Sequence, residues 1–147
     1  MKEFKGRVLF PGTFKGEAVV SHQGLNTLAS FQTSALLPTS KKIIVGDQNN
    51  PDLYKKNITN KALCLPQTIG STTGGMVIQT VAVRNLAPKV WLFSESIDPL
   101  AASGIILSND WNDVGLIAID RLGEEFLSTV KTGDQIEVKE DGTVIIY

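Results

Sequence analysis

The stretch Pro66–Gly75, PQTIGSTTGG, concentrates hydroxyl side chains and glycines between two apolar runs. The pattern predicts a buried strand over Lys61–Pro66 and a helix over 72–87. A loop that leaves a parallel strand and enters a helix is where open α/β sheets bind ligands. Free backbone N–H groups at the start of a helix favour an anion there. The stretch therefore either holds an anionic ligand beside a reactive hydroxyl or only caps the helix that follows.

The candidate ligand-binding residues lie at the centre of this stretch. Gly70 and Gly74 let the backbone approach an anion closely, and Ser71, Thr72 and Thr73 add hydroxyl donors. The plain structural alternative is that one of these hydroxyls is the helix N-cap, worth about 1 kcal/mol. The stretch is not a P-loop, because no Gly-Lys-Ser/Thr ends it, and it is not the G-x-G-x-x-G dinucleotide signature.

Few other residues suit metal or acid–base chemistry. The sequence contains one histidine, His22, and one cysteine, Cys64. Because a His/Cys metal site usually takes three or four ligands, we expect no metal site on this chain. The neighbours of Cys64 in ALCLP are apolar, which predicts a buried and unreactive thiol.

Composition excludes several classes of function. The 147 residues carry a net charge of −1, so there is no basic excess for nucleic-acid binding. No apolar stretch approaches the roughly 18 residues of a membrane span, and the N-terminus lacks the apolar run of a signal peptide. A single cysteine needs no oxidising compartment. We expect a cytoplasmic protein that binds neither nucleic acid nor a membrane.

The rest of the sequence predicts the elements around the loop. Strands are expected over Lys61–Pro66, Pro88–Ser94 and Val114–Asp120, and helices over 72–87, 98–110 and 121–134. Asp98 and Pro99 form a helix-start signal, and Gly133 is expected to end the last helix. The final segment, 135–147, is predicted to be a hairpin with a turn at Asp141–Gly142.

The first sixty residues are less regular. Gly6–Phe10 and Gly16–Ser21 are predicted as two strands joined by a turn, and Lys41–Asp47 as a further strand. Asp47–Asn60 is expected to be a polar surface excursion. Together the elements predict one α/β domain over 1–147. We expect a swivelling-domain β/β/α sandwich, in which a short parallel sheet is flanked by helices and by a smaller β layer.

Four segments in register resemble the swivel domain, or small subunit, of the aconitase X family. They are LPQTIGSTTGG, APKVWLF, DPLAASGIIL and TGDQIEV, and the opening GRVLFPGTFKGEAVVS also resembles the family's N-terminal hairpin. The resemblance implies a dehydratase small subunit, similar to that of phosphomevalonate dehydratase. It implies a larger aconitase-like partner, in a heterodimer or larger assembly, that carries an iron–sulfur cluster, with none on this chain. It implies a small anionic hydroxy-acid substrate, with Ser71 as the proton-abstracting catalytic residue.

Departures from the family pattern leave other functions open. The family's Arg before the Gly-Ser pair is Ile69 here, and its second Ser is Thr72. A cis-3-hydroxy-L-proline dehydratase subunit, or a diverged binding module without catalysis, therefore stays possible. The segment TTGGMVIQTVAVRN also resembles the phosphohistidine domain of phosphoenolpyruvate-using enzymes. That alternative is disfavoured, because the matching region has no histidine and His22 lies far away in sequence.

Overall fold

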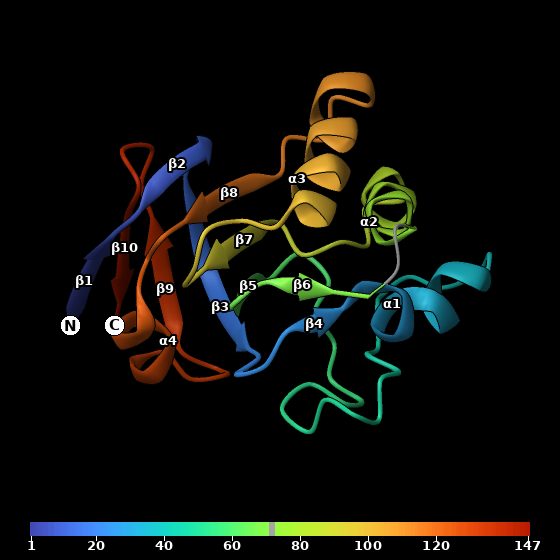
Figure 1. Ribbon diagram of the computed structural model, residues 1–147, viewed down its shortest axis with the longest axis horizontal. Coiled ribbons are helices and arrows are strands. Elements are labelled where there is room, and N and C mark those ends of the chain that lie inside the picture. The colour runs from blue at the N-terminus through green and yellow to red at the C-terminus, as the bar shows by residue number, and fades with distance from the viewer. Residues whose placement is uncertain (71–72) are drawn as a thin grey trace.

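The computed structural model describes residues 1–70 and 73–147. Its strands are β1 (Lys2–Lys5), β2 (Arg7–Phe10), β3 (Phe14–Val20), β4 (Leu25–Asn26), β5 (Ala62–Leu65), β6 (Thr68–Ile69), β7 (Val90–Phe93), β8 (Ile117–Asp120), β9 (Gln135–Val138) and β10 (Thr143–Ile146). Its helices are α1 (Thr27–Leu36), α2 (Gly74–Val83), α3 (Pro99–Ile106) and α4 (Glu124–Thr129), and α3 continues into the π-helical turn η1 (Leu107–Trp111). Figure 1 shows these elements arranged as two β layers and a helix layer.

Eight strands form one continuous sheet in the order β1-β10-β9-β3-β5-β7-β8-β2. The long strand β3 belongs to both β layers. Its first half, Phe14–Glu17, pairs antiparallel with β9, and its second half, Ala18–Val20, pairs parallel with β5. The β/β/α sandwich predicted from the sequence is confirmed.

The central strands β3, β5, β7 and β8 run parallel. Every residue of β5, β7 and β8 is buried, as expected for strands that are covered on both faces. Side chains alternate between the faces: Leu63 and Leu65 pack toward the helices, whereas Ala62 and Cys64 pack toward the second β layer. The three predicted buried strands are therefore confirmed.

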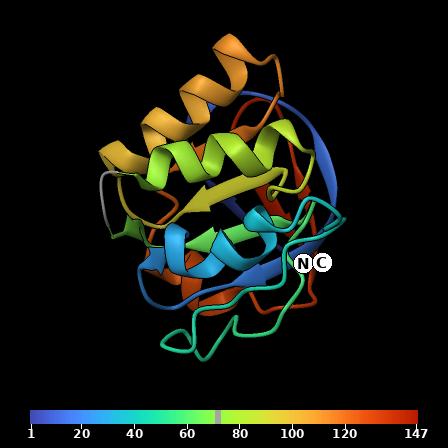
Figure 2. The ribbon, with the colours of Figure 1, turned by 90° about the vertical axis from the view of Figure 1, so that its right-hand side faces the viewer.

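The helices α1, α2 and α3 lie side by side over one face of the parallel strands (Figure 2). Phe31 of α1, Ile78 of α2 and Ile105 of α3 enter one apolar cluster with Trp91 of β7. The opposite face packs against β9, β10 and α4, where Phe126 is fully buried. Two separate cores therefore hold the middle layer in place.

Several sequence predictions differ from the structure. Gly6–Phe10 contains β2, and Gly16–Ser21 covers most of β3, which begins earlier, at Phe14. The two strands do not pair with each other: β2 pairs with β8, and β3 pairs with β5 and β9. The Pro-Gly turn signal is local and does not specify a pairing partner. Lys41–Asp47 forms only one isolated bridge, from Ile44 to Asn57.

The last predicted helix is also shorter than expected. It ends at Thr129 because Val130 is extended and the Asp134 carboxylate accepts the Lys131 N–H at 2.8 Å, which closes a separate turn. Gly133 lies in that turn at φ 97° and does not cap the helix. The predicted C-terminal hairpin is confirmed, with Gly142 at φ 91°. Within residues 1–70 and 73–147, no helix is long and apolar enough to cross a membrane.

Candidate active site

The candidate site begins where β5 ends. The chain passes from Leu65 through Pro66 and Gln67 into the short strand β6, which pairs in parallel with β4 through Leu25↔Thr68 and Asn26↔Ile69. This pairing extends the C-terminal edge of the parallel sheet toward the helix layer. It fixes the backbone that leads into the glycine- and hydroxyl-rich loop.

Asp98 ties that backbone to the start of α3. Its carboxylate accepts the Thr68 N–H at 2.7 Å and also accepts the Thr68 hydroxyl. The same carboxylate accepts the Ala101 N–H at 3.0 Å, which makes Asp98 the N-cap of α3, as the sequence predicts. One partly buried carboxylate therefore sets the position of two elements at the site.

The N-termini of α1, α2 and α3 converge around the loop. Asn26 caps α1 by accepting the Ala29 N–H at 3.0 Å, and Thr73 occupies the N-cap position of α2. The ends of α1 and α2 are so close that a Cβ on Gly74 would lie 2.7 Å from Thr27 Oγ1. Helix N-termini carry partial positive charge, so this arrangement favours an anion or a developing negative charge at the loop.

Two glycines are required by this geometry. Gly70 has φ 115°, which favours glycine, and it lies directly over the Asn26 side chain. A Cβ on Gly75 would lie 2.5 Å from Ser103 Oγ and 3.2 Å from the Leu100 carbonyl oxygen. Gly75 therefore permits the close contact between α2 and α3.

Three of the predicted site residues are among those that the structure describes, and two are not. Gly70 is exposed at the end of β6, Thr73 is exposed with its carbonyl oxygen accepting the Val77 N–H at 3.1 Å, and Gly74 is buried as the first residue of α2. Ser71 and Thr72 lie outside the described residues. The described flanks, Gly70 and Thr73–Gly74, lie where three helices begin.

The contribution of β4 and α1 to the site was not predicted from the sequence. Asn26 and Thr27 lie more than forty residues before the loop, yet they border Gly70 and Gly74. An Asn before an apolar helical segment is an N-cap signal, so the start of α1 could have been predicted. The pairing of Asn26 with Ile69 could not, because it depends on the tertiary fold.

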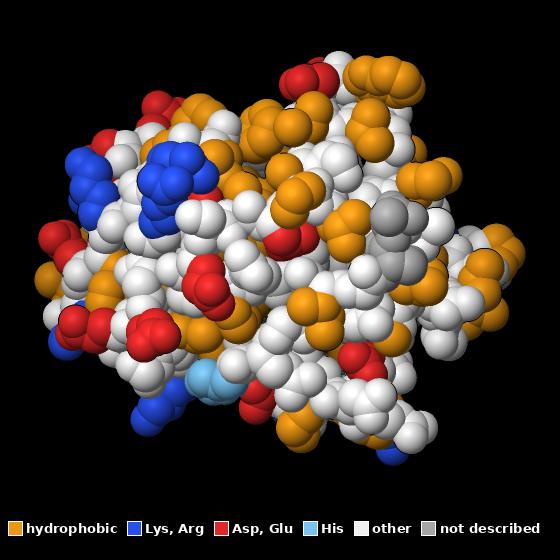
Figure 3. All heavy atoms as spheres, in the orientation of Figure 1, with side chains coloured by type: hydrophobic (Ala, Val, Ile, Leu, Met, Phe, Trp, Pro, Cys, Tyr) orange, Lys and Arg blue, Asp and Glu red, His pale blue; other side chains and the backbone are white. Residues whose placement is uncertain are grey.

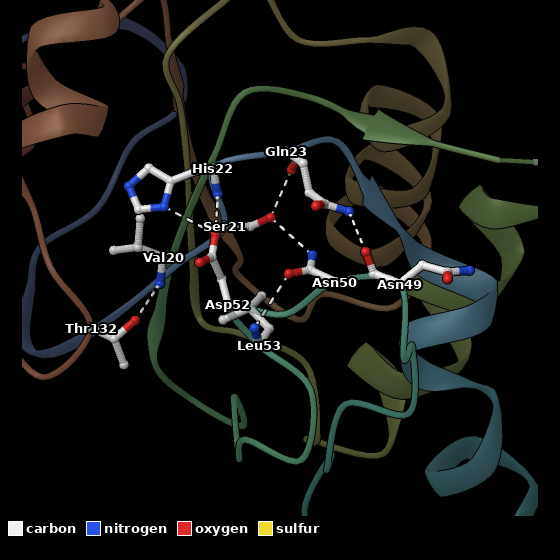
Figure 4. A network of polar contacts seen from close by, with 9 residues as sticks. All are labelled: Val20, Ser21, His22, Gln23, Asn49, Asn50, Asp52, Leu53 and Thr132. Atoms are coloured by element: carbon white, nitrogen blue, oxygen red, sulfur yellow. Dashed lines mark hydrogen bonds and ion pairs between the residues drawn. The ribbon is translucent and has the colours of Figure 1, made fainter.

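His22 lies at the same edge of the sheet but belongs to a structural network (Figure 4). Its Nδ1 lies 3.0 Å from Asp52 Oδ2, and its backbone N–H donates to the same oxygen at 2.8 Å. Behind this pair, the buried Asn50 donates to Ser21 Oγ at 3.0 Å and accepts the Leu53 N–H at 3.3 Å. The network fastens the polar segment 47–54 to the end of β3.

An ion pair between a half-exposed arginine and a buried aspartate supports the segment before Asp98. Arg7 forms a bidentate contact with Asp120, at 2.9 and 2.6 Å, and Asp120 also accepts the Ile97 N–H at 2.8 Å. Burial alone would raise the pKa of Asp120, but the Arg7 guanidinium and the Ile97 N–H hold that pKa below its usual value. The pair therefore links β2 and β8 to the backbone that leads into α3.

Metal-ligating residues are sparse on this chain. Among the residues that the structure describes, no group of three His, Cys, Asp or Glu side chains could hold a metal ion. Cys64 is fully buried, and burial raises the pKa of its thiol far above the usual range, as expected for an unreactive cysteine.

Known relatives cover almost the whole chain. Phosphomevalonate dehydratase small subunits from Methanocella arvoryzae and Methanocaldococcus jannaschii are each 29% identical, over 96% and 97% of this chain and 94% and 95% of their own lengths. The small subunit of that name from Pyrococcus furiosus is 30% identical over 71% of this chain and 72% of its own length.

Solved structures agree with these relatives. Aconitase X from Thermococcus kodakaraensis, solved in its holo-form, superposes with a TM-score of 0.82 at 28% identity, covering 100% of this chain and 99% of that chain. The solution structure of a UPF0107 protein shares the fold, with a TM-score of 0.75 at 20% identity over 99% of both chains. The sequence profile of the aconitase X swivel domain matches residues 3–146. The chain belongs to the aconitase X swivel domain family.

Proposed function

We propose that this chain is the small subunit of an aconitase X-type hydro-lyase, with phosphomevalonate as the first substrate to test. The observation that carries the proposal is the match to phosphomevalonate dehydratase small subunits over nearly the full chain. A chain with one histidine and one cysteine suits part of an active site that a larger subunit completes. Because a single cysteine needs no oxidising compartment, we place this complex in the cytoplasm.

In the proposed reaction, water is lost from a 3-hydroxy acid. A base takes the proton from the carbon beside the carboxylate, and the electron pair of that C–H bond forms the new double bond. The hydroxyl on the neighbouring carbon takes up a proton and leaves as water. We assign the base to Ser71 and contacts to the anionic substrate to Gly70, Thr72, Thr73 and Gly74.

The surroundings of the loop support a serine base. A serine hydroxyl is a weak base unless its negative charge is stabilised. The N-termini of α1 and α2 meet beside Gly74, and their partial positive charges favour an alkoxide there. No basic side chain on this chain is needed for that effect.

We place the iron–sulfur cluster on the larger subunit. Clusters are generally held by several cysteine thiolates. This sequence has only Cys64, which is buried in β5 between two apolar neighbours. The residues of this chain therefore do not fit a cluster, and its contribution to the reaction belongs to the partner.

The proposal is tested by reconstitution. The chain is used as bait in its native host, the co-purified protein is assayed for iron and sulfide, and the complex is tested with phosphomevalonate and cis-3-hydroxy-L-proline. We expect the complex, but not this chain alone, to eliminate water from one of the two.

The matched variants are Ser71→Ala and Ser128→Ala. We expect Ser71→Ala to lower kcat at least about a hundredfold, because it removes the base. Ser128 lies on α4, away from the loop, and its alanine variant should retain the activity of the unchanged complex. Near-full activity in Ser71→Ala would refute the catalytic assignment.

Ile69 supports a second candidate, a diverged binding module without catalysis. The Ile69 side chain is half exposed and lies over Gly24, where a Cβ would be 2.6 Å from its Cγ2. An apolar side chain here supplies no cation for an anionic substrate. This candidate is favoured if the chain binds a larger subunit equally well with or without Ser71 and the complex eliminates water from neither acid.

A further inference from the structure

The helix layer, defined as α1, α2, α3 and η1, carries almost no charge. The sequences of α1, α2 and α3 are TLASFQTSAL, GGMVIQTVAV and PLAASGII, and none contains Asp, Glu, Lys or Arg. Asp110 in η1 is the one charged residue of the layer. Charged residues make up 20% of the chain, and helices that face water normally carry them on their outer side. The outer side of this layer is therefore unlike a solvent-facing surface.

Exposed apolar side chains gather on the same layer. Its exposed large apolar residues are Leu36, Met76, Val83, Ile106 and Trp111. Trp111 is 79% exposed and Met76 is 64% exposed. Figure 3 shows hydrophobic side chains over α1, α2 and α3, while most charged side chains lie on the side of β1, β10 and α4. A gathering of exposed apolar side chains on a surface that carries few charges is typical of a protein interaction site.

The apolar surface has a shape that can receive a partner. On α2, Met76, Thr80 and Val83 form one exposed stripe with helical spacing. Beside this stripe, a groove of about 230 Å³ is lined by Leu28, Gln32, Ala35, Leu36, Val77 and Thr80. Depletion of charge and enrichment in Met and Trp are typical of the cores of protein interfaces.

We propose that the helix layer is the docking face for the larger subunit of the dehydratase. This inference rests on the proposed function and names the surface through which the two subunits meet. The site and the surface are continuous: Ile69 is exposed at one end of the loop, and Met76 is exposed in the first turn of α2. A partner that reaches the loop therefore meets the α2 stripe next, and its matching surface is apolar and uncharged.

The test introduces charge at exposed positions of the layer. Met76→Lys and Val83→Lys, combined in one chain, place two ammonium groups on the α2 stripe. Both replaced residues are exposed, so the core is left unchanged. Ser128→Lys introduces the same group at an exposed position of α4, on the opposite side of the molecule. Thermal unfolding of each variant checks that the fold is intact. Affinity for the purified larger subunit is then measured by calorimetry.

We expect the double variant to raise Kd at least about tenfold. A charge buried at the interface loses its hydration, and no opposite charge is there to compensate for that loss. Ser128→Lys should bind like the unchanged chain. If the unchanged chain binds the larger subunit and the double variant binds equally well, the docking face is wrong while the proposed function stands.

Two other outcomes overturn the inference in different ways. An unchanged chain that does not bind the larger subunit refutes the proposed function and the docking face together. If sedimentation shows that the unchanged chain forms a dimer and the double variant is a monomer, the layer is covered by a second copy of this chain.

Discussion

At the residue scale, Asp98 does more than begin a helix. It accepts the Ala101 N–H at the start of α3, and it accepts both the N–H and the hydroxyl of Thr68. A carboxylate that accepts several hydrogen bonds holds its neighbours more strongly than a neutral cap does. The backbone that enters the candidate loop therefore depends on a residue thirty positions later in the chain.

Asp98→Ala should lower the free energy of unfolding by about 2–4 kcal/mol, because it removes a helix cap and leaves the Thr68 N–H without its acceptor. Urea denaturation measures the change. Asp98→Asn is the matched control, since Asn remains a good cap and an acceptor, and it should cost less. Equal stability of the alanine variant and the unchanged protein would contradict this role.

At the element scale, the close approach of α2 and α3 sets where the loop ends and α2 begins. Gly75 faces Ser103 and Leu100 of α3 without an intervening side chain. At the other end of α2, Arg84 donates to the carbonyl oxygens of Ala35 and Leu37 at 2.9 Å, which satisfies the C-terminus of α1. The helix α2 is thus held at both ends by its neighbours.

Gly75→Ala should destabilise the protein by about 1–3 kcal/mol, because the new methyl group overlaps Ser103 Oγ and presses on the Leu100 carbonyl. The loss is measured as a lower midpoint in urea. Adding Ser103→Ala removes one of the two contacts and should restore part of the stability. No rescue in the double variant would show that the Ser103 contact does not carry the cost.

The same elements explain what could be predicted from sequence. Continuous apolar runs predicted β5, β7 and β8, and an Asp-Gly pair predicted the last hairpin, because these signals are local. The pairing of β2 and β3 was predicted wrongly, since a turn signal does not say which strand lies next to which. At the site, the glycine- and hydroxyl-rich stretch was predicted to lie between a strand and a helix, and Gly70 follows β6 while Gly74 begins α2. The contacts from Asn26 and from Asp98 to Thr68 could not be, because they join residues distant in sequence.

At the scale of the whole molecule, the Arg7–Asp120 pair joins the N-terminal segment to the parallel sheet. The Asp120 side chain is fully buried, whereas Arg7 is half exposed. Because the folded protein lowers the pKa of Asp120, the unfolded chain takes up its proton first on acidification. The stabilisation that the Arg7–Asp120 pair provides is therefore present above about pH 4. It is lost as the pH falls through the pKa of Asp120 in the folded protein.

Arg7→Met should reverse this dependence. Without the guanidinium, burial of Asp120 disfavours the carboxylate, so we expect the unfolding free energy to fall at pH 7, by an amount that shrinks toward pH 4. Lys2→Met is the control, because Lys2 and Glu125 form an exposed ion pair that contributes little to stability. Unfolding free energies at several pH values measure both. A loss in Arg7→Met that is the same at every pH would contradict the assignment to Asp120.

The strand residues between Lys2 and Glu17 pair with strands that lie late in the chain. Lys2 pairs with Ile146 in β10, Arg7 pairs with Asp120 in β8, and Phe14 pairs with Val138 in β9. On the ribosome, these early strands must remain unpaired until the last residues emerge, and closing such long loops slows folding. We therefore expect the nascent chain to depend on chaperones, and a chain that stops before β9 to aggregate instead of folding.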